Sequence, residues 1–241
     1  MKHGLGGIPS VPDSQDWETP LDTAVPLPER FLLPGIPAAY NQHNTPKCGG
    51  FAGAGLKGVQ EREDGHGFLP FDGSWLYGRA QQYDGIPLPH VGTTARGVCK
   101  ALAKEGCRVA GKPGTTAANY RIASYTALPF TYDAIKRAIH AYQTPVLIGS
   151  AWYDSWFHPV KGVLPAPDTV AGGHLFWAWA WDDNVQGGSL LCQNSWGQYV
   201  GSVNGRFYAP IAICYPASTT RGCSMIARET DRWTSTSTRS P

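Results

Sequence analysis

The hydrophobic periodicity of this 241-residue chain changes at Pro145. Before that position, apolar residues recur at three- and four-residue spacings, the pattern of helices with one buried side. After it, short apolar or alternating runs are separated by Gly, Asp and Asn, the pattern of strands. The expected helices span residues 48–63, 74–83, 94–105 and 131–142, and the expected strands span 146–152, 175–181, 189–193 and 205–208. The sequence therefore predicts an α+β protein, mainly helical in its first half and mainly antiparallel β in its second.

The two ends of the chain lack such periodicity. Residues 1–40 contain seven prolines, which remove backbone donors and favour extended conformations, so we expect an extended arm there. Residues 229–241 are rich in Ser and Thr and have no periodic apolar face, which predicts a flexible tail. The length of the whole chain suits one large domain or two closely packed lobes.

The charge balance argues against several classes of partner. Lys and Arg number 20 and Asp and Glu number 18, for a formal net charge of +2. Interspersed charges of both signs give no field that would concentrate nucleic acid or anionic lipid, so we expect neither nucleic acid nor a membrane as partner. The most apolar run, Leu175 to Trp181, is far shorter than the roughly 20 residues of a membrane-spanning helix. No signal-peptide core is recognisable, which favours an intracellular or particle-associated protein.

Neither a metal nor a cofactor is expected. The six cysteines lie far apart and form no C-x-x-C pair with nearby His residues, which disfavours structural zinc. Cys99 with Cys107, or Cys214 with Cys223, could form a disulfide, but free buried thiols are equally compatible with the sequence, as they are for Cys192. The glycines of residues 53–58 match G-x-G-x-x-G, but no strand precedes them, so a dinucleotide site is rejected.

Cys48 is the first chemically distinctive residue, because it stands where a helix is expected to begin. Unpaired amides and the helix dipole at such a position favour the thiolate over the thiol. The competing interpretation is an ordinary buried cysteine. Gln42 precedes Cys48 by six positions, His174 follows Gly172-Gly173, and Asn194 opens the sequence Asn-Ser-Trp-Gly that contains Trp196. His174 and Asn194 lie 126 and 146 positions after Cys48, near the papain-type separation of about 130 to 150 residues.

These motifs, over about residues 40–210, resemble the papain-like cysteine peptidases, in particular bacterial-type members without a long propeptide. Gly7-Ile8-Pro9 and the segment 12–17 are similar to a leader in such members. Two departures stand out: Thr45 replaces a cysteine of the usual Cys-Gly-Ser-Cys-Trp motif, and Gly49-Gly50 follow the nucleophile position. The usual propeptide of about a hundred residues is absent from the 47 positions before Cys48, so we do not expect latency by that device.

The resemblance implies a two-lobed fold over residues 41–228, with a helical lobe at about 41–130, a β-rich lobe at about 131–228 and the active site between them. It implies a polypeptide substrate and leaves the oligomeric state open. Cys48 would be the nucleophile and His174 its partner in a thiolate–imidazolium pair. Asn194 would orient His174, Gln42 would donate to the oxyanion, and Trp196 would shield the His174–Asn194 hydrogen bond.

Two alternatives to peptide hydrolysis stay open at this point. The same triad could serve an acyltransferase or an amidase, since the catalytic residues alone do not select water as the acceptor. The fold could also have lost turnover and act in binding or structure, which Gly49-Gly50 make conceivable.

Overall fold

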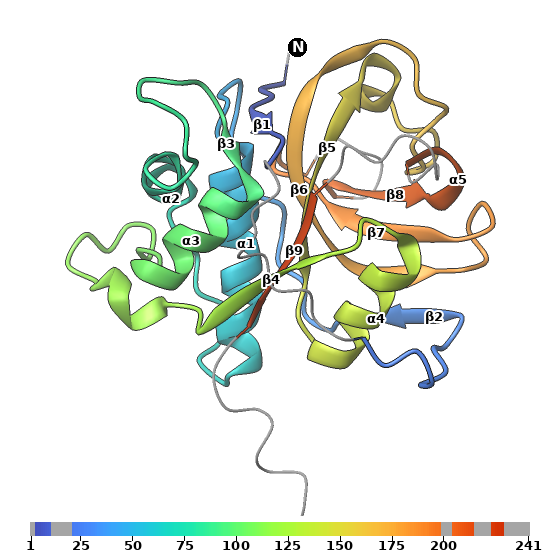
Figure 1. Ribbon diagram of the computed structural model, residues 1–241, viewed down its shortest axis with the longest axis horizontal. Coiled ribbons are helices and arrows are strands. Elements are labelled where there is room, and N and C mark those ends of the chain that lie inside the picture. Colours follow the sequence, from blue (N-terminus) through green and yellow to red (C-terminus); the bar gives the residue numbers. More distant parts are fainter. Residues whose placement is uncertain (1–2, 11–20, 199–203, 215–222, 229–241) are drawn as a thin grey trace, which may run out of the picture.

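The computed structural model describes residues 3–10, 21–198, 204–214 and 223–228. For residues 213–214 and 223–228 it describes the backbone alone. Helices and sheet occupy opposite sides of the molecule (Figure 1). Helices α1 (Cys48–Glu63), α2 (Gly73–Gln81) and α3 (Ala95–Lys104) pack together on one side. Most of the sheet lies on the other side, with α4 (Tyr132–Tyr142) packed against it. The predicted α+β fold with two lobes is confirmed.

Helices α2, α3 and α4 begin where capping side chains satisfy their first amides, whereas α1 begins after Lys47 without a side-chain cap. The side chain of Asp72 accepts from Trp75 N–H at the start of α2, and Thr94 accepts from Gly97 N–H at the start of α3. Thr131 does the same for α4 through the N–H of Ala134. The four predicted helices are confirmed, with ends that differ by no more than two residues.

Glycines in α1 allow its neighbours to approach closely. A Cβ on Gly50 would lie 2.1 Å from the carbonyl oxygen of Gly73 in α2, and one on Gly53 would lie 2.5 Å from a methyl carbon of Val98 in α3. On the opposite side, Gly55 faces the indole of Trp177. Tertiary packing therefore compensates for the low helix propensity of these glycines.

The main sheet is antiparallel and runs in the order β4-β9-β5-β6-β7-β8, with β2 also paired to β6. Its central strand β6 is much longer than the predicted run and bulges between Ala178 and Ala180. The strands are β2 (Arg30–Leu32), β4 (Ser124–Leu128), β5 (Val146–Tyr153), β6 (Val170–Asp182), β7 (Ser189–Gln193), β8 (Arg206–Pro210) and β9 (Cys223–Arg228). The four predicted strands are confirmed as β5 to β8, while β2, β4 and β9 were not predicted.

The position of β4 differs from the predicted boundary between the two lobes. The sequence division at about residue 130 would assign Ser124–Leu128 to the helical lobe, yet this strand pairs with β9 in the sheet. Both β4 and β9 also contact α3, so they connect the two lobes. The reason is that the sequence of β4, Ser-Tyr-Thr-Ala-Leu, contains no apolar run like that of β7, so it is recognised as a strand only through its pairing with β9.

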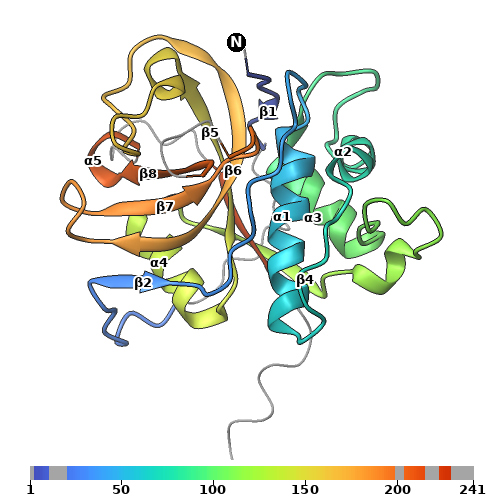
Figure 2. The same ribbon diagram turned by 180° about the vertical axis from the view of Figure 1, so that it is seen from behind.

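The described parts of the arm, residues 3–10 and 21–40, contribute to both lobes. Strand β2 extends the sheet along the end of β6, and the segment after it follows the junction of the lobes to the start of α1 (Figure 2). Strand β1 (Gly7–Ile8) pairs in parallel with β3 (Thr93–Thr94), which immediately precedes α3. The predicted tail at 229–241 and the leader-like segment 12–17 lie outside the described residues.

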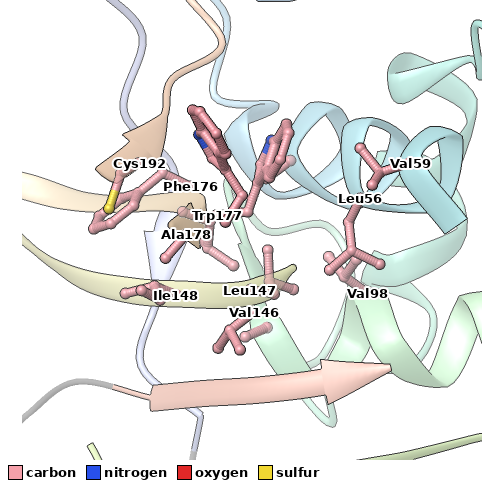
Figure 3. Packing of buried hydrophobic residues seen from close by; sticks show 14 of the residues in the cluster. Leu56, Val59, Val98, Val146, Leu147, Ile148, Phe176, Trp177, Ala178 and Cys192 are labelled. Carbon is pink, nitrogen blue, oxygen red and sulfur yellow. The ribbon is translucent and has the colours of Figure 1, made fainter. Parts of the chain in front are cut away.

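The core fills the space between α1 and the sheet. Leu56 and Val59 of α1, Val98 of α3 and Leu147 of β5 meet there, beside Trp177 of β6 (Figure 3). Large aromatic side chains, among them the buried indole of Trp181, supply much of the apolar area of the β-rich lobe. This packing fixes the position of α1, and therefore of Cys48, relative to β6.

Within the described part of the chain, no helix has the length and apolar character needed to cross a membrane. The same residues contain no group of three or more His, Cys, Asp or Glu side chains placed to hold a metal ion. Cys48, Cys99, Cys107 and Cys192 are buried and are not joined to one another, so the disulfide between Cys99 and Cys107 is not formed.

Candidate active site

Cys48 is the first residue of α1, as predicted, and its side chain is fully buried. Burial raises the pKa of its thiol to about 11, because the anion loses its hydration. Backbone N–H groups of Leu175, Gly49 and Gly6 oppose this rise in part. The helix start therefore does not by itself produce a thiolate in this structure.

His174 lies in β6, opposite Ser150 of β5, and is also fully buried. Its Nε2 atom lies 2.9 Å from Oδ1 of Asn194, and that oxygen also accepts from the N–H of Ser195 at 2.8 Å. Because Oδ1 is an acceptor only, Nε2 must carry the proton, and Nδ1 is left as a free lone pair. Nδ1 is buried and has no hydrogen-bond partner. The imidazole thus has a base poised at Nδ1.

Burial also controls the charge of His174. It lowers the pKa of the imidazole to about 4, and the hydrogen bond to Asn194 opposes the shift only in part. With the pKa of Cys48 raised and that of His174 lowered, both groups are neutral near pH 7. These shifts disfavour the expected thiolate–imidazolium pair, because burial removes the hydration of both charged forms and the hydrogen bonds offset that loss only in part.

Gln42 is buried at the junction of the lobes, and all its polar atoms have partners. Its Nε2 donates to the carbonyl oxygens of Gly4 at 3.0 Å and Thr45 at 2.6 Å. Its Oε1 accepts from Oγ of Ser195 at 2.5 Å. Its backbone N–H donates to the carbonyl of Ser195 as well, so the loop before Cys48 is fastened to the segment that carries Asn194.

Ser195 is a site residue that the sequence reasoning missed. Its hydroxyl donates to Oε1 of Gln42. The N–H groups of the Gln42 amide therefore point the other way, toward the carbonyls of Gly4 and Thr45. The signal was present in the motif Asn-Ser-Trp-Gly, where Ser195 stands between two residues that were singled out.

Trp196 covers the imidazole of His174. The two rings stack with centroids 4.6 Å apart and an interplanar angle of 27°. On another side, Trp152 meets His174 edge-on, with centroids 4.8 Å apart. Trp152 is buried, and it forms a second wall of the imidazole site.

Asp84 holds the β3 strand beside the site and was not singled out from the sequence. Its side chain is completely buried and pairs with Nε2 of His90 at 3.0 Å. It accepts from the hydroxyls of Thr93 and Thr94 at 2.9 and 2.8 Å and from the N–H of Thr94 at 2.9 Å. These bonds fix the backbone that pairs with β1.

The unusual Gly49-Gly50 pair has a packing explanation. A Cβ on Gly49 would lie 2.4 Å from a methyl carbon of Thr93, and one on Gly50 would collide with the backbone of α2. The first turn of α1 is thus closely surrounded by α2 and β3. The two glycines that depart from the usual motif stand where α1 lies too close to α2 and β3 for a larger side chain.

Residues 3–8 lie between the lobes, where they contact Gln42, Cys48, His174 and Trp196. The N–H of Gly6 donates to the carbonyl of Gly173 at 3.0 Å, and its carbonyl accepts from the N–H of Thr93 at 2.9 Å. Gly7 faces the backbone of His174 so closely that a Cβ there would lie 2.6 Å from the His174 nitrogen. The start of the arm is therefore part of the site, which its sequence did not indicate.

The structure brings together Cys48, His174, Asn194 and Gln42, with Trp196 over the imidazole. Asn194 and Gln42 are linked to each other through Ser195. The thiol of Cys48 lies against the N–H of Leu175, the residue after His174. The result is an acceptor nitrogen, a thiol and an amide donor at one junction.

Solved structures of cysteine proteases have the same architecture. Xylellain, a cysteine protease from Xylella fastidiosa, matches with a TM-score of 0.83 and 22% identity, over 95% of this chain and 97% of that chain. Procathepsin B S9 from Trypanosoma congolense matches with a TM-score of 0.73 and 14% identity, over 94% and 85%. The cysteine protease and lectin-like domains of Cwp84, a surface layer associated protein of Clostridium difficile, match with a TM-score of 0.68 and 17% identity, over 95% and 57%.

No family model and no curated protein sequence matches the chain. At the identities of the solved structures, the likeness establishes the fold. The chain has a two-lobed, papain-like α+β fold.

Proposed function

We propose that this chain of papain-like fold is a cysteine peptidase, with Cys48 as nucleophile, His174 as base, Asn194 as orienting residue and Gln42 as oxyanion donor. One observation carries the proposal: the His174–Asn194 hydrogen bond leaves Nδ1 unprotonated and unpartnered at the junction where Cys48 lies. A fold by itself does not define a reaction, so the proposal depends on this geometry.

The reaction would start when Nδ1 of His174 takes the proton of the Cys48 thiol. The thiolate attacks the carbonyl carbon of a peptide bond, a carbon–sulfur bond forms, and the carbonyl electrons move to oxygen. The tetrahedral species then expels the amine, which takes the proton from His174, and leaves a thioester. Water, deprotonated by His174, attacks the thioester, and the released thiolate recovers the proton.

Gln42 suits the role of oxyanion donor because its Nε2 already donates to a carbonyl oxygen, that of Gly4. The N–H of Cys48 itself would be the second donor. Removal of one such donor in comparable sites costs about 2.7 to 4 kcal/mol of transition-state stabilisation. The hydroxyl of Ser195 supports this role by fixing the orientation of the amide.

A polypeptide is the substrate class that the surrounding backbone favours. The N–H of Thr93 and the carbonyl of Gly173 each bond to main-chain atoms of one extended residue, Gly6. Paired main-chain donors and acceptors recognise an extended peptide without reading its side chains. We therefore propose an extended polypeptide as substrate.

The test is a peptide-library cleavage profile of the wild type, Cys48→Ala and a matched control, Cys192→Ala, which removes a buried thiol of the core. Because Gly7 lies against His174, each protein is also prepared with Gly7→Val. Cleavage in either background that is lost with Cys48→Ala and kept with Cys192→Ala supports the proposal. Cleavage that survives Cys48→Ala would sink it.

A catalytically inert papain-fold protein is the second candidate, favoured by the raised pKa of Cys48 and the lowered pKa of His174. Ultraviolet absorbance of the thiolate against pH separates the two in the Gly7→Val background. A peptidase should form a Cys48 thiolate well below the unperturbed pKa of about 8.5. For acyl transfer, added amines should appear in the product.

A further inference from the structure

Thr45, which stands where the usual motif has a cysteine, follows Gln42 by three positions in the loop that leads to α1. We propose that Thr45 is a positioning residue for the oxyanion donor: its hydroxyl closes the turn at residues 42–45 and so aims one N–H of the Gln42 amide at the reacting carbonyl. The link to the reaction rests on the proposed function, whereas the restraint on the amide is a matter of geometry and has a test of its own.

Two hydrogen bonds of opposite direction join Thr45 and Gln42. Oγ1 of Thr45 donates to the main-chain carbonyl oxygen of Gln42 at 2.5 Å. In return, Nε2 of Gln42 donates to the main-chain carbonyl oxygen of Thr45 at 2.6 Å. Each side chain therefore restrains the backbone of the other residue, and the direction of the amide is tied to the conformation of the turn.

The atoms of the Gln42 amide have separate partners. A primary amide carries two N–H donors and one carbonyl acceptor in a single plane. Oε1 accepts from the hydroxyl of Ser195, and one N–H is taken up by the carbonyl of Thr45. Nε2 also donates into the junction of the lobes, to the carbonyl of Gly4. Because the group is planar, the two fixed contacts determine the direction in which the remaining N–H points.

Ser195 and Thr45 restrain the amide from different parts of the chain. Ser195 follows Asn194 after β7, whereas Thr45 lies just before α1. The contact to Ser195 alone would leave the amide able to pivot about Oε1. The bond to Thr45 removes this freedom before a substrate binds, and a donor aimed in advance needs no reorganisation during the reaction.

The tip of the turn depends on local hydrogen bonds. His43 and Asn44 are exposed, so packing contributes little to holding them. His43 has φ of +55°, in the left-handed region that is uncommon for residues other than glycine. Its N–H donates to Oδ1 of Asn41 at 2.8 Å, and the hydroxyl of Thr45 closes the turn from the other end. Loss of that hydroxyl should therefore loosen the turn.

The chemistry of threonine suits this task. Its hydroxyl is a full donor, and branching at Cβ restricts the rotamer that carries the hydroxyl. Serine keeps the donor without the branch, and valine keeps the branch without the donor. A thiol would be only a weak donor at this position. If the hydrogen bond is what matters, serine should replace Thr45 and valine should not.

The first test is steady-state kinetics with a peptide substrate, in each of the wild-type and Gly7→Val backgrounds that cleaves. Thr45→Val should lower kcat by about threefold to tenfold, the effect of one lost hydrogen bond, and should change KM by less than about twofold. Thr45→Ser should keep about half of kcat or more. Thr115→Val is the matched control, because the Thr115 hydroxyl also donates to the carbonyl three residues earlier, that of Lys112, and it should leave kcat unchanged.

A double-mutant cycle separates positioning from a general structural role. If Thr45 acts through the amide, Thr45→Val should have no further effect on kcat in a Gln42→Ala background. An equal loss of kcat in both backgrounds would overturn the proposal, as would an unchanged kcat in Thr45→Val or a failure of Thr45→Ser to preserve it. Iodoacetamide should alkylate Cys48 at the rate of the parent protein. A changed rate would mean that the substitution has moved the start of α1, which would also overturn the proposal.

A second measurement does not depend on turnover. NMR of protein labelled with ¹⁵N in its glutamine side chains gives the rate at which the Nε2 protons of Gln42 exchange with water, and Gln42→Ala identifies their signal by its loss. Exchange should be about fivefold faster in Thr45→Val than in the wild type, because the turn opens more often, and nearly unchanged in Thr45→Ser.

Unchanged exchange in a folded Thr45→Val protein would overturn the proposal, and Thr45→Ala takes its place if Thr45→Val does not fold. Faster exchange in a protein that cleaves no peptide in either background would uphold the restraint by Thr45 and contradict the proposed peptidase function instead.

Discussion

The hydroxyl of Ser195 donates to Oε1 of Gln42 at 2.5 Å, across 153 positions of sequence. Through this bond the segment that orients His174 also orients the amide on the other side of the site. The base and the oxyanion donor are therefore positioned by one short stretch of chain, Asn194-Ser195-Trp196.

Replacement of this hydroxyl should affect the amide alone. Ser195→Ala removes one hydrogen bond, worth about 1 kcal/mol, and should lower kcat by roughly fivefold in the Gly7→Val background. Gln42→Ala removes the donor itself and should lower kcat by about a hundredfold to a thousandfold. Steady-state kinetics with a peptide substrate compares the two. A larger loss of kcat for Ser195→Ala than for Gln42→Ala would contradict the proposal that Ser195 acts through the amide of Gln42.

Asp84→Ala should weaken peptide binding more than it slows the chemistry. The carboxylate fixes Thr93, whose N–H holds the backbone of the bound segment. We expect KM to rise several-fold with a smaller change in kcat, and the stability to fall by about 1–3 kcal/mol as buried partners lose an acceptor. Asp133→Asn, an exposed surface change, is the control and should alter neither KM nor stability appreciably. An unchanged KM would show that Thr93 keeps its place without Asp84.

Alanine substitutions of two glycines should have opposite effects on stability. Gly50→Ala places a methyl group against the backbone of Gly73 and should destabilise the protein by about 1–3 kcal/mol or more, despite better helix propensity. Gly78→Ala meets no neighbour and should stabilise α2 by about 0.5–1 kcal/mol. Urea denaturation measures both. Equal effects would mean that helix propensity outweighs the packing of α1 on α2.

Stability should be greatest between about pH 6.5 and 9, for reasons set by the two buried site residues. The pKa of His174 is lowered from 6.5 to about 4, so on acidification the unfolded chain takes up a proton first and stability falls through that range. The pKa of Cys48 is raised from 9.0 to about 11, so the unfolded chain loses its proton first and stability falls as pH rises between them.

Thermal unfolding across this pH range provides the measurement. His174→Gln should flatten the acidic side of the curve of Tm against pH, and Cys48→Ala should flatten the alkaline side. Curves of unchanged shape would mean that these two groups do not control the pH dependence.

The sequence predicted the long helices and the central strands well because their patterns are local. The amphipathic repeat of α4 and the apolar run of β6 can each be recognised without knowledge of a partner. Strand β2 has only three residues, and β4 has no apolar run like that of β7, so both are recognised only through the strands they pair with.

The same difference between local patterns and properties of the assembled protein applies to the site. Order and spacing placed Cys48, His174 and Asn194 together because these are properties of the chain. Burial is a property of the assembled protein, and it left the thiol and the imidazole neutral. The role of Gly4 to Gly7 was equally hidden, since a run of glycines near a proline-rich arm indicates only an extended, permissive backbone.

The position of residues 4–8 between the lobes also bears on the order of events during synthesis. These residues leave the ribosome before Cys48 and well before His174, and chains begin to fold from the segment made first. The segment is therefore already present when the two halves of the site come together around it. A nascent chain that folds in this order would enclose the thiol of Cys48 only when the β-rich half of the site closes on the half made first.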